Sequence, residues 1–578
     1  MSRTNDQIAA VFEQIADVLQ ILGTDRFRIN AFARAGRALA DLTDDVADIG
    51  PDLEQLTKID GIGKGMAKRV AEWLTTGELE EHEELMSQIP AGLLELLEVG
   101  GLGPKTIGLL WKDAGVESLG DLKLKLEGDQ LAALPGLGKK KLDNLRKSIA
   151  FAESSGGRVV LGRALPLALR FVESLDKLKT VKQATYAGSL RRGRDTIGDL
   201  DIIVAAEPDD AAAISDAFVG LEPVTEVLVK GVTKTSVRTQ DKVQADLRIV
   251  APGQFGAALM YFTGSKEHNI VMRQRAIEQS MRLNEYGLFR DGETVAAETE
   301  QNVFAALGLP WIPPELREDR GEFAQAETAA LPDLIELRDI RAELHAHTTA
   351  SDGRWSIEEL AEAAARRGFH TVAVTDHSQS EAQANGLTPQ RLERHIEAVH
   401  AVRDRMKDSI HILVGSEVDI LADGKLDYPD SLLAELDLVV ASPHSALTAE
   451  PAKATGRLIK AIENPYVTII GHPTGRLIGR REGLSPDMKQ VISAAAARGI
   501  SLEINANHNR LDLRDTHARA AIEAGVKLSI NTDAHGPGNL DELIYGVVTA
   551  RRAGAGAGDV VNCMSQSELL KWIRSTRP

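Results

Sequence analysis

Three different patterns of apolar residues divide the chain. Within residues 1–22 apolar residues recur at helical spacing, which predicts an amphipathic core helix. Between residues 158 and 310 a helical segment is followed by short β-rich runs, which predict a small mixed or antiparallel sheet. From residue 341, seven apolar runs alternate with helical stretches, and this predicts a parallel β/α barrel with its active site at the carboxyl ends of the strands. The seven runs are RAELHAH, TVAVTDH, HILVGSE, LDLVVASPH, YVTIIGHP, SLEINAN and KLSINTDAH.

The composition is that of a folded chain of several domains. Its 578 residues are 43% hydrophobic and 26% charged, which fits neither disorder nor a fibrous repeat. The one cysteine, Cys563, excludes an intramolecular disulfide and a thiolate zinc cluster and is typical of a reducing compartment. The first helix carries acids and so is no signal peptide, and no apolar run approaches the ~20 residues of a membrane span. We therefore expect a cytoplasmic, nucleoid-associated protein.

Charge and histidine are distributed differently. The net charge of −18 is spread over the whole chain, so the total says little about a polyanionic partner. Of the 14 histidines, two (His82 and His268) precede residue 341 and 12 follow it. This difference predicts a domain boundary near residue 341, and with a single cysteine in the chain any metal must be bound by histidine and carboxylate.

Three hairpins in the first 150 residues have the form Gly-apolar-Gly followed by basic residues. They are KIDGIGKGMAKRV (58–70), VGGLGPKTIGLL (99–110) and ALPGLGKKKLDNL (133–145). Glycine permits the tight turn, and the helix that follows begins with N–H groups free to bind a phosphate. One such hairpin could be an ordinary helix-helix turn, but three beside lysines indicate helix-hairpin-helix motifs that bind the DNA backbone without reading sequence. The predicted DNA-binding residues are Gly61, Gly63, Lys64, Lys68, Arg69, Gly101, Gly103, Lys105, Gly136, Gly138 and Lys139.

The segment YAGSLRRGRDTIGDLDIIV (186–204) predicts a nucleotidyl-transfer site. Asp199 and Asp201 alternate on a strand and so share a face, and Asp246 in VQADLRIV could complete the site. Carboxylates that point together repel unless a cation lies between them, which favours divalent metal. Two metals would activate the attacking oxygen and neutralise pyrophosphate, and the Gly188–Ser189 turn would cradle a triphosphate. The alternative is a solvated strand face.

With YFTGS (261–265) and the three hairpins, this segment resembles the family X DNA polymerases over residues 1 to about 318. The resemblance implies that Asp199, Asp201 and Asp246 are catalytic and hold two Mg²⁺ or Mn²⁺ ions. It also implies that Asp246 draws the proton of the primer 3′-hydroxyl. Nucleotide contacts are implied for Gly188, Ser189, Arg192, Gly198, Tyr261, Phe262, Gly264, Asn269 and Arg273.

Two positions depart from the family pattern. Animal members carry an arginine where this chain has Gln244, so the support of Asp246 must differ. Members with 5′-deoxyribose phosphate lyase activity use a lysine where this chain has Arg69, and a guanidinium cannot form the Schiff base. We therefore expect no lyase activity and interpret Arg28, Lys64 and Arg69 as phosphate binders.

Metal-capable residues end most strands of the predicted barrel. They are His345, His347, Asp352, Asp376, His377, Glu417, His444, His472, Asp533 and His535. A lone buried histidine is usually a satisfied core residue, but this number at one end of successive strands indicates a multinuclear site. Imidazole and carboxylate without thiolate favour Zn²⁺, Mn²⁺ or Fe²⁺, and hydrolysis of a phosphoester is the expected chemistry.

The motifs HAHTTASDG, TDH, GSE, SPH, GHP and NTDAH resemble the PHP (polymerase and histidinol phosphatase) domain from residue 341 to about 570. The resemblance implies up to three ions, Zn²⁺ and/or Mn²⁺. The first would be bound by His345, His347, Glu417 and Asp533, the second by Glu417, His444 and His472, and the third by Asp352, His377 and His535. Asp376 is expected to be structural. Arg476, Arg480 and Arg481 either steer DNA towards the metals or form a solvated loop.

The predicted architecture is multidomain, α+β and α/β. It comprises a helical helix-hairpin-helix domain (1–90), a second, fingers-type one (91–155), a nucleotidyltransferase palm with a small mixed sheet (156–252), a thumb (253–318), a linker (319–340) and a distorted (β/α)7 PHP barrel (341–578). The predicted function is gap-filling DNA polymerisation in repair with a 3′ to 5′ exonuclease and an abasic-site endonuclease. Expected partners are gapped or nicked DNA, deoxynucleoside triphosphates and, transiently, repair proteins, and we expect a monomer. The alternatives are a template-independent nucleotidyltransferase with a small-molecule phosphoesterase domain, and a non-catalytic DNA-end scaffold.

Overall fold

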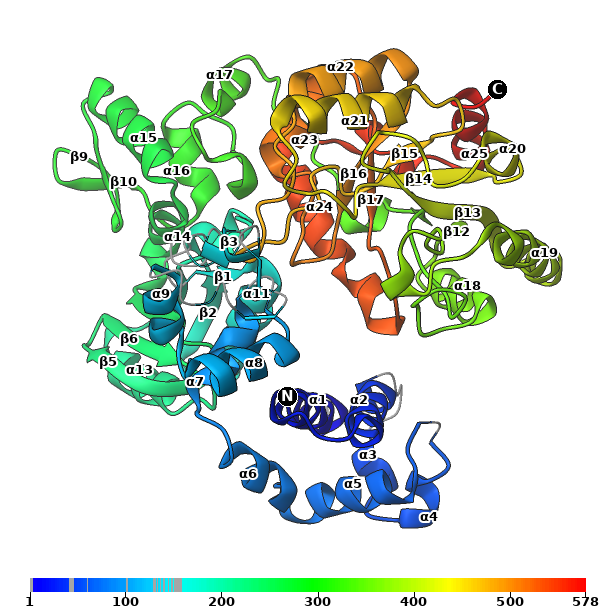
Figure 1. Cartoon of the computed structure of the whole chain (residues 1–578). Coiled ribbons are helices and arrows are strands. Elements are labelled where there is room, and N and C mark those ends of the chain that lie inside the picture. Colours follow the sequence, from blue (N-terminus) through cyan, green and yellow to red (C-terminus); the bar gives the residue numbers. More distant parts are fainter. Residues whose placement is uncertain are drawn as a thin grey trace. The chain divides into compact units, whose positions relative to one another are not determined.

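The computed structural model describes residues 4–40, 46–59, 61–99, 102–127, 131, 134–135, 137–138, 141–143, 145–146, 149 and 158–578 (Figure 1). The chain divides into two units. The first comprises residues 1–155 with 479–481, and the second comprises residues 156–478 and 482–578. No helix in the described part is long and apolar enough to cross a membrane.

The first unit is built of helices. The predicted first helix is α1 (Thr4–Leu22), and its buried face packs on α2 (Arg26–Ala40), with the rings of Phe12 and Phe32 edge to face at 5.4 Å. The helices that follow are α3 (Val46–Ile49), α4 (Leu53–Leu56), α5 (Lys64–Thr76), α6 (Glu80–Met86), α7 (Gly92–Glu95), the 3₁₀ turn η1 (Leu96–Glu98), α8 (Pro104–Ala114) and α9 (Leu119–Glu127).

The second unit begins with a mixed sheet, as the β-rich runs predict. Its elements are β1 (Val159–Val160), α11 (Leu161–Asp176), β2 (Val181–Tyr186), α12 (Gly188–Arg191), β3 (Thr196–Ile197), β4 (Asp199–Ala206), η2 (Pro208–Asp210), α13 (Ala211–Val219), β5 (Val224–Lys230), β6 (Lys234–Thr239), β7 (Gln244–Val250) and η3 (Pro252–Gln254). The five-stranded sheet has the order β2-β4-β7-β6-β5, and β4 and β7 are parallel. Phe171 of α11 and Phe218 of α13 lie 5.1 Å apart in the core beneath it.

The next elements pack as a small α+β layer. They are α14 (Phe255–Thr263), α15 (Lys266–Glu278), β8 (Arg282–Asn284), β9 (Gly287–Arg290), β10 (Glu293–Ala296), α16 (Glu300–Ala306), η4 (Pro314–Leu316), α17 (Glu322–Glu327) and η5 (Leu337–Asp339). Buried Arg317 pairs with Glu300 at 2.7 Å, and Glu300 also binds Arg191 at 2.8 Å, which ties this layer to the palm. The segment expected to be a linker contains α17, where buried Glu322 lies 3.0 Å from His268.

The C-terminal part has the predicted seven parallel strands, in chain order from β11 to β17. Its elements are β11 (Ala342–Glu343), α18 (Ile357–Arg366), β12 (Thr371–Val374), η6 (Ala382–Ala384), α19 (Pro389–Met406), β13 (His411–Asp419), α20 (Asp430–Leu433), β14 (Leu438–Ser442), α21 (Pro451–Glu463), β15 (Ile469–Ile470), α22 (Met488–Arg498), β16 (Ser501–Asn505), α23 (Asp515–Glu523), β17 (Leu528–Asn531), η7 (Pro537–Glu542), α24 (Leu543–Ala553), η8 (Ala557–Asp559), η9 (Val561–Cys563) and α25 (Gln566–Ser575).

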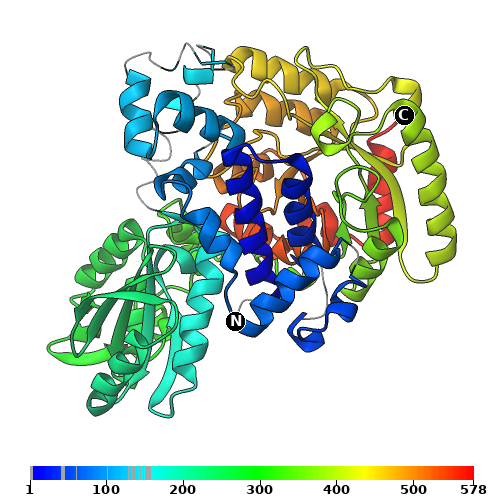
Figure 2. The same ribbon diagram turned by 60° about the horizontal axis from the view of Figure 1, so that its bottom comes forward.

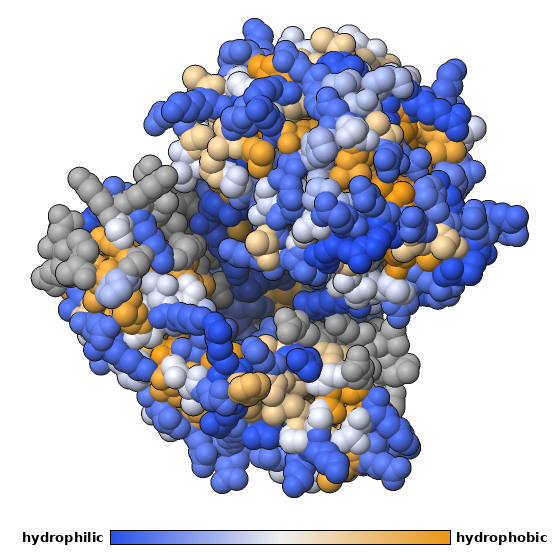
Figure 3. All heavy atoms as spheres, turned by 45° about the vertical axis from the view of Figure 1, so that its right-hand side comes forward, coloured by the Kyte–Doolittle hydropathy of each residue, from blue (hydrophilic) through white to orange (hydrophobic). Residues whose placement is uncertain are grey.

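The barrel is nearly closed. A bridge between Ala346 and Ala534 brings the segments after β11 and β17 together, and helices surround the strands (Figures 1 and 2). Inside, Leu569 and Ile573 of α25 join a buried cluster with strand residues such as Leu413 and Val440. The outer surface in view in Figure 3 is mainly hydrophilic with scattered apolar residues. Side chains therefore fill the interior of the barrel, and the carboxyl ends of the strands remain available to form a site.

Candidate active sites

Three carboxylates meet on the palm sheet. Asp199 and Asp201 lie on β4, and Asp201 is directly opposite Asp246 on the parallel strand β7. Burial, together with the charges of Asp199 and Asp246, raises the pKa of Asp201 to about 7. Three acids this close cannot all ionise at low cost without a cation. The arrangement therefore fits a divalent-metal site.

Two side chains support Asp246. Gln244 Nε2 donates to Asp246 Oδ1 at 2.8 Å, and Lys234 Nζ lies 2.8 Å from Oδ2. Burial acts to raise the pKa of Asp246, but hydrogen bonds from Lys234, Ser236 and Gln244 hold it below its ordinary value. Gln244 therefore supports Asp246 through a hydrogen bond from an uncharged side chain. Lys234 was not predicted, because only the sheet order places β6 beside β7.

The predicted triphosphate turn lies against these acids. Gly188 has a φ of +64°, and a Cβ added to it would overlap Asp201 Oδ2, so only glycine fits. Ser189 follows in the short helix α12, and Ala187 N–H donates to Asp201 O at 2.8 Å. The backbone of the turn and the strand that carries Asp199 and Asp201 are therefore fixed to each other.

Arg192 is engaged with residues beyond the palm sheet. Its Nη1 donates to Thr263 O at 2.5 Å, and its Nε donates to Glu318 Oε1 at 3.1 Å. Gly264 lies beside it, since an added Cβ would be 3.1 Å from Arg192 Nη1. A triphosphate at this guanidinium would compete with Glu318. Gly198 is next to Asp199, and its added Cβ would be 3.0 Å from Arg158 Nη1.

The remaining predicted nucleotide contacts lie on α14 and α15. Asn269 Nδ2 donates to Tyr261 O at 2.7 Å, which links the two helices. The rings of Tyr261 and Phe262 are edge to face at 5.2 Å, and the Arg248 guanidinium lies 4.4 Å from the centre of the Phe262 ring. Arg273 is exposed. Phe262 is thus partly a packing residue, whereas Asn269 and Tyr261 are held in a fixed pair.

The hairpins place their glycines as the pattern predicts. Gly63 and Gly103 are the residues before α5 and α8, and Lys64 and Lys105 are exposed in the first turns. Gly61 has a φ of +85°. Exposed Lys68 and Gly138 belong to the same pattern, while Gly101, Gly136 and Lys139 lie outside the described residues.

The residue at the lyase position has an acidic partner. Arg69 and Arg28 both pair with Glu81, Arg28 at 2.6 Å, and this pairing holds the pKa of Glu81 below its ordinary value although burial acts to raise it. Arg69 also lies over the ring of Phe32. A phosphate bound by these arginines would have to compete with Glu81.

The barrel gathers the nine predicted metal ligands at the carboxyl ends of its strands. Glu417, in β13, is at the centre. Its carboxylate lies 2.9 Å from His472 Nε2, 2.9 Å from His377 Nδ1, 3.2 Å from His444 Nε2 and 3.3 Å from His345 Nε2. On the other side His347 Nε2 is 3.0 Å from Asp533 Oδ1, and His535 Nε2 is 3.3 Å from Asp352 Oδ1.

The donor atoms form groups that could each hold an ion. The groups are His345, His347, Glu417 and Asp533; His347, Asp352, His377 and His535; His377, Glu417 and His444; and Glu381, Asp419 and His444. The first is the predicted set, and the second adds His347 to the predicted Asp352, His377 and His535. The third has His377 in the place predicted for His472, which is in none of the groups found among the described residues, and the fourth contains Glu381 and Asp419, which were not predicted as ligands. His345 Nε2, His377 Nδ1 and Glu417 Oε2 are buried and lie close together, yet none of them makes a hydrogen bond of acceptable geometry with a described residue. Buried polar atoms without a hydrogen bond are expected where those atoms bind a metal ion. The residues therefore fit bound cations.

Comparisons with known proteins agree with this geometry. Family models match residues 3–79 (helix-hairpin-helix domain), 93–150 (SAM-like helix-hairpin-helix tandem), 258–318 (DNA polymerase beta thumb) and 343–507 (PHP domain). The chain is 38% identical over 571 residues to the DNA polymerase/3′-5′ exonuclease PolX of Bacillus subtilis (strain 168), covering 98% of this chain and 99% of that protein. The chain belongs to the family X DNA polymerases with a PHP domain. It is therefore a nucleotidyltransferase that also carries an exonuclease domain.

Two further relatives of this family X polymerase match parts of the chain. DNA polymerase lambda of Rattus norvegicus is 26% identical over 344 residues, 54% of this chain and 56% of that protein. A probable phosphatase of Thermoanaerobacter sp. (strain X514) is 32% identical over 204 residues, 33% of this chain and 77% of that protein.

The PHP domain of this family X polymerase has a second layer of acids that the sequence did not reveal. Glu503 lies 2.8 Å from His345 Nδ1 and accepts the His472 N–H at 2.8 Å. Asp419 lies 3.1 Å from His444 Nδ1. These acids fix the ring orientation of the ligands. Strand alternation could have found Asp419, which lies two residues after Glu417 on the same face of β13.

Other predicted residues near this site have structural contacts. Asp376 accepts hydrogen bonds from Thr348 and Ser351 and lies 2.8 Å from His395 Nε2, which is the structural role expected of it. Arg476 is buried, and its Nη1 donates to Asp195 Oδ2 of the palm at 3.1 Å. It therefore joins the palm to the barrel and does not form a solvated loop.

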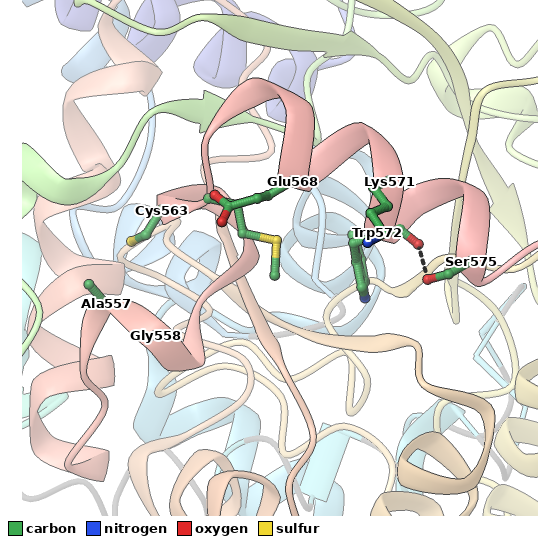
Figure 4. Close-up of a pocket in the computed structure, with 8 residues that line it drawn as sticks. Ala557, Gly558, Cys563, Glu568, Lys571, Trp572 and Ser575 are labelled. Atoms are coloured by element: carbon green, nitrogen blue, oxygen red, sulfur yellow. Dashed lines mark hydrogen bonds between the residues drawn. The ribbon is translucent and has the colours of Figure 1, made fainter.

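A cavity of about 590 Å³ at the other end of the barrel holds none of this chemistry (Figure 4). It is lined by Cys563, Met564 and residues of α25 such as Trp572. His370, just before β12, lies 2.9 Å from Met564 O, which places the cavity at the amino ends of the strands. Burial raises the pKa of the Cys563 thiol to about 12, so it is no nucleophile at neutral pH.

Proposed function

We propose that this enzyme fills short gaps in DNA during repair and corrects or trims 3′ ends with its barrel. The observation that carries the proposal is the presence of two complete and chemically distinct clusters in one chain. One consists of Asp199, Asp201 and Asp246. The other is the histidine-rich group around Glu417.

In the palm, the proposed roles follow from position. The Gly188–Ser189 backbone and Arg192 bind the triphosphate next to Asp201. Tyr261 lines the sugar pocket, and Asn269, which is hydrogen-bonded to the Tyr261 carbonyl, contacts the nascent pair. Asp246, kept ionised by Gln244 and Lys234, accepts the proton of the primer 3′-hydroxyl. Two Mg²⁺ or Mn²⁺ ions held by the three aspartates would supply charge neutralisation at the leaving pyrophosphate.

In the barrel, the nine ligands would hold up to three ions, Zn²⁺ and/or Mn²⁺, which would supply the Lewis acidity for phosphodiester hydrolysis. Glu503 and Asp419 hold the rings of His345 and His444 in place. A 3′ to 5′ exonuclease is the proposed activity, and hydrolysis at abasic sites uses the same chemistry.

The proposed substrates are gapped or nicked DNA and deoxynucleoside triphosphates, bound by a monomer. The support is the glycine-lysine hairpins, whose exposed Lys64 and Lys105 stand at helix N-termini. Such contacts hold the backbone without reading bases, so binding should fall steeply with salt.

The test is a labelled primer on one-nucleotide-gapped DNA, with and without nucleotides. The variants are Asp199→Ala with Asp201→Ala, and His345→Ala with His347→Ala. Exposed Asp209→Ala and His400→Ala are the matched controls. On this gap, we expect the aspartate variant to lose only primer extension and the histidine variant to lose only primer shortening. On an abasic duplex, we expect the histidine variant to lose cleavage and the aspartate variant to keep it. A wild-type protein that binds the gap but neither extends nor shortens the primer would favour the scaffold, and equal extension of single-stranded primers would favour template-independent transfer.

A further inference from the structure

A pocket of about 260 Å³ lies within the second unit, where the palm meets the barrel. Its palm wall is the loop Gly193–Asp195, which follows α12. Its barrel wall is formed by the start of α23 and by residues of α24, and Arg320 from the segment before α17 also lines it. The pocket is distinct from both clusters of metal ligands.

The pocket has an excess of positive charge. Five arginines line it, namely Arg194, Arg320, Arg476, Arg514 and Arg552, against two aspartates, Asp195 and Asp515. The chain as a whole has 67 basic and 85 acidic residues, so this excess runs against the composition.

The two aspartates of the pocket already pair with arginines that line it. Asp515 Oδ2 lies 3.0 Å from Arg320 Nη1 and 2.8 Å from Arg552 Nη2. Asp195 pairs with Arg476 at 3.1 Å.

Glu318, behind the wall, is shared in the same way. It binds Arg192 at 3.1 Å, Arg552 at 3.0 Å and, more weakly, Arg194 at 3.6 Å. Arginines therefore still outnumber acids when Glu318 is counted, and cations held close together around one pocket favour a bound anion.

Unused hydrogen-bond donors face the same space. Arg514 lines the pocket and is exposed, and its side chain makes no ion pair or hydrogen bond with any described residue. The N–H groups of Asp515 and Thr516, in the first turn of α23, have no acceptor within the described part of the chain. Free helix N–H groups beside a guanidinium are the donor set that binds phosphate. The volume is below the ~300–1,000 Å³ of pockets for drug-sized ligands, so it suits a small anion.

We propose that this pocket binds a phosphate group between Arg514, Arg320 and the start of α23, with Arg194 contacting it from the palm. The phosphate is either a backbone phosphate of bound DNA or free inorganic phosphate. Because Arg194 and Asp195 continue the loop that carries Gly188 and Arg192, a phosphate held here would connect the barrel to the nucleotide-binding turn.

The test compares Arg514→Gln with Arg519→Gln in the full-length protein. Arg519 is on the same helix, outside the pocket, and lies 3.5 Å from Glu523. In the first arm, inorganic phosphate is titrated calorimetrically at constant ionic strength. Any phosphate binding at the barrel metals is common to all variants, so the difference between them reports the pocket. We expect phosphate to bind about tenfold more weakly to Arg514→Gln than to wild type. Arg519→Gln should bind phosphate with the wild-type affinity.

In the second arm, affinity for gapped DNA is measured against salt. A backbone contact at Arg514 should reduce the slope of log affinity against log salt by about one in Arg514→Gln. Loss in the first arm alone assigns the pocket to free phosphate, and a reduced slope assigns it to DNA. If Arg514→Gln, with an unchanged melting temperature, matches Arg519→Gln in both arms, the proposal is wrong. Neither arm depends on catalysis, so failure here is distinguishable from failure of the proposed enzyme activities.

Discussion

The palm and the barrel hold their charged groups in opposite ways. In the palm, three carboxylates lie on neighbouring strands, Asp199 is exposed, and the nearby cations are Lys234, which pairs with Asp246, and Arg248. In the barrel, the ligands are mostly buried, and two rings have a second acid behind them: His345 has Glu503 and His444 has Asp419. A half-exposed cluster of acids is completed by ions and substrate together, whereas a buried cluster with an oriented second layer is built to keep its ions.

The two chemistries can share one chain because their residues lie on separate sheets. The palm carboxylates belong to a five-stranded sheet and the barrel ligands to a separate seven-stranded sheet. The two are joined through side chains such as Arg476 and Arg552 that are not metal ligands. A change in one cluster should therefore leave the other active, and the following changes test this independence.

The largest effect should come from Glu417→Gln. Glu417 is central to the barrel cluster, within 3.3 Å of His345, His377, His444 and His472, so the variant removes a charge shared between ions. Substitutions in the second layer of a metal site typically lower activity ~10- to 100-fold. We expect Glu417→Gln to lower the rate of primer shortening by more than this and to leave the rate of gap filling unchanged. The measurement is the rate of each reaction on the same labelled DNA. Equal loss of gap filling would show that the sites are not independent.

Gly188→Ala should have the next largest effect, and on the other reaction. The added methyl group would overlap Asp201 Oδ2 at a position where φ is +64°. Displacing a catalytic group by about 1 Å can lower the rate ~100-fold. We expect incorporation to fall by about that factor while shortening continues, measured by single-turnover kinetics. Gly253→Ala, which meets no neighbouring atom, is the control.

Asp419→Asn tests the second layer of the barrel. The variant removes the charge that lies 3.1 Å from His444 Nδ1 without changing shape. We expect ~10- to 100-fold weaker binding of the ion at His444, read as metal content after dialysis against increasing chelator. Exposed Asp404→Asn should retain its metal like wild type. Equal retention by both variants would mean that the second layer does not hold the ions.

The sequence identifies the candidate ligands better than the residues that support them. Strand-end residues such as His345 and Glu417 could be found because the alternation of apolar runs identifies where each strand ends. Lys234 could not, because its contact with Asp246 depends on β6 lying beside β7. The pairing of Arg192 with Glu318 joins residues 126 positions apart, and no local pattern contains that information.

The smallest effect should come from Gln244→Ala, which tests how little support the palm needs. Gln244 donates one hydrogen bond to Asp246, and Lys234 remains in the variant. Because Lys234 still pairs with Asp246, losing this bond should cost only the ~0.5–1.5 kcal/mol of an ordinary hydrogen bond and lower kcat by about threefold to tenfold, with KM for nucleotide unchanged.

The pH dependence gives the sign of this last effect. Burial acts to raise the pKa of Asp246, and the hydrogen bonds that oppose it keep the pKa lowered, so removing one of them raises it. Asp246 must be ionised to accept a proton, and the acidic limb of the pH–rate profile should therefore move to higher pH in Gln244→Ala. Gln244→Arg, the residue of animal members, should return the limb to low pH because a guanidinium favours the carboxylate. A profile that does not move in Gln244→Ala would show that Lys234 alone sets the ionisation of Asp246.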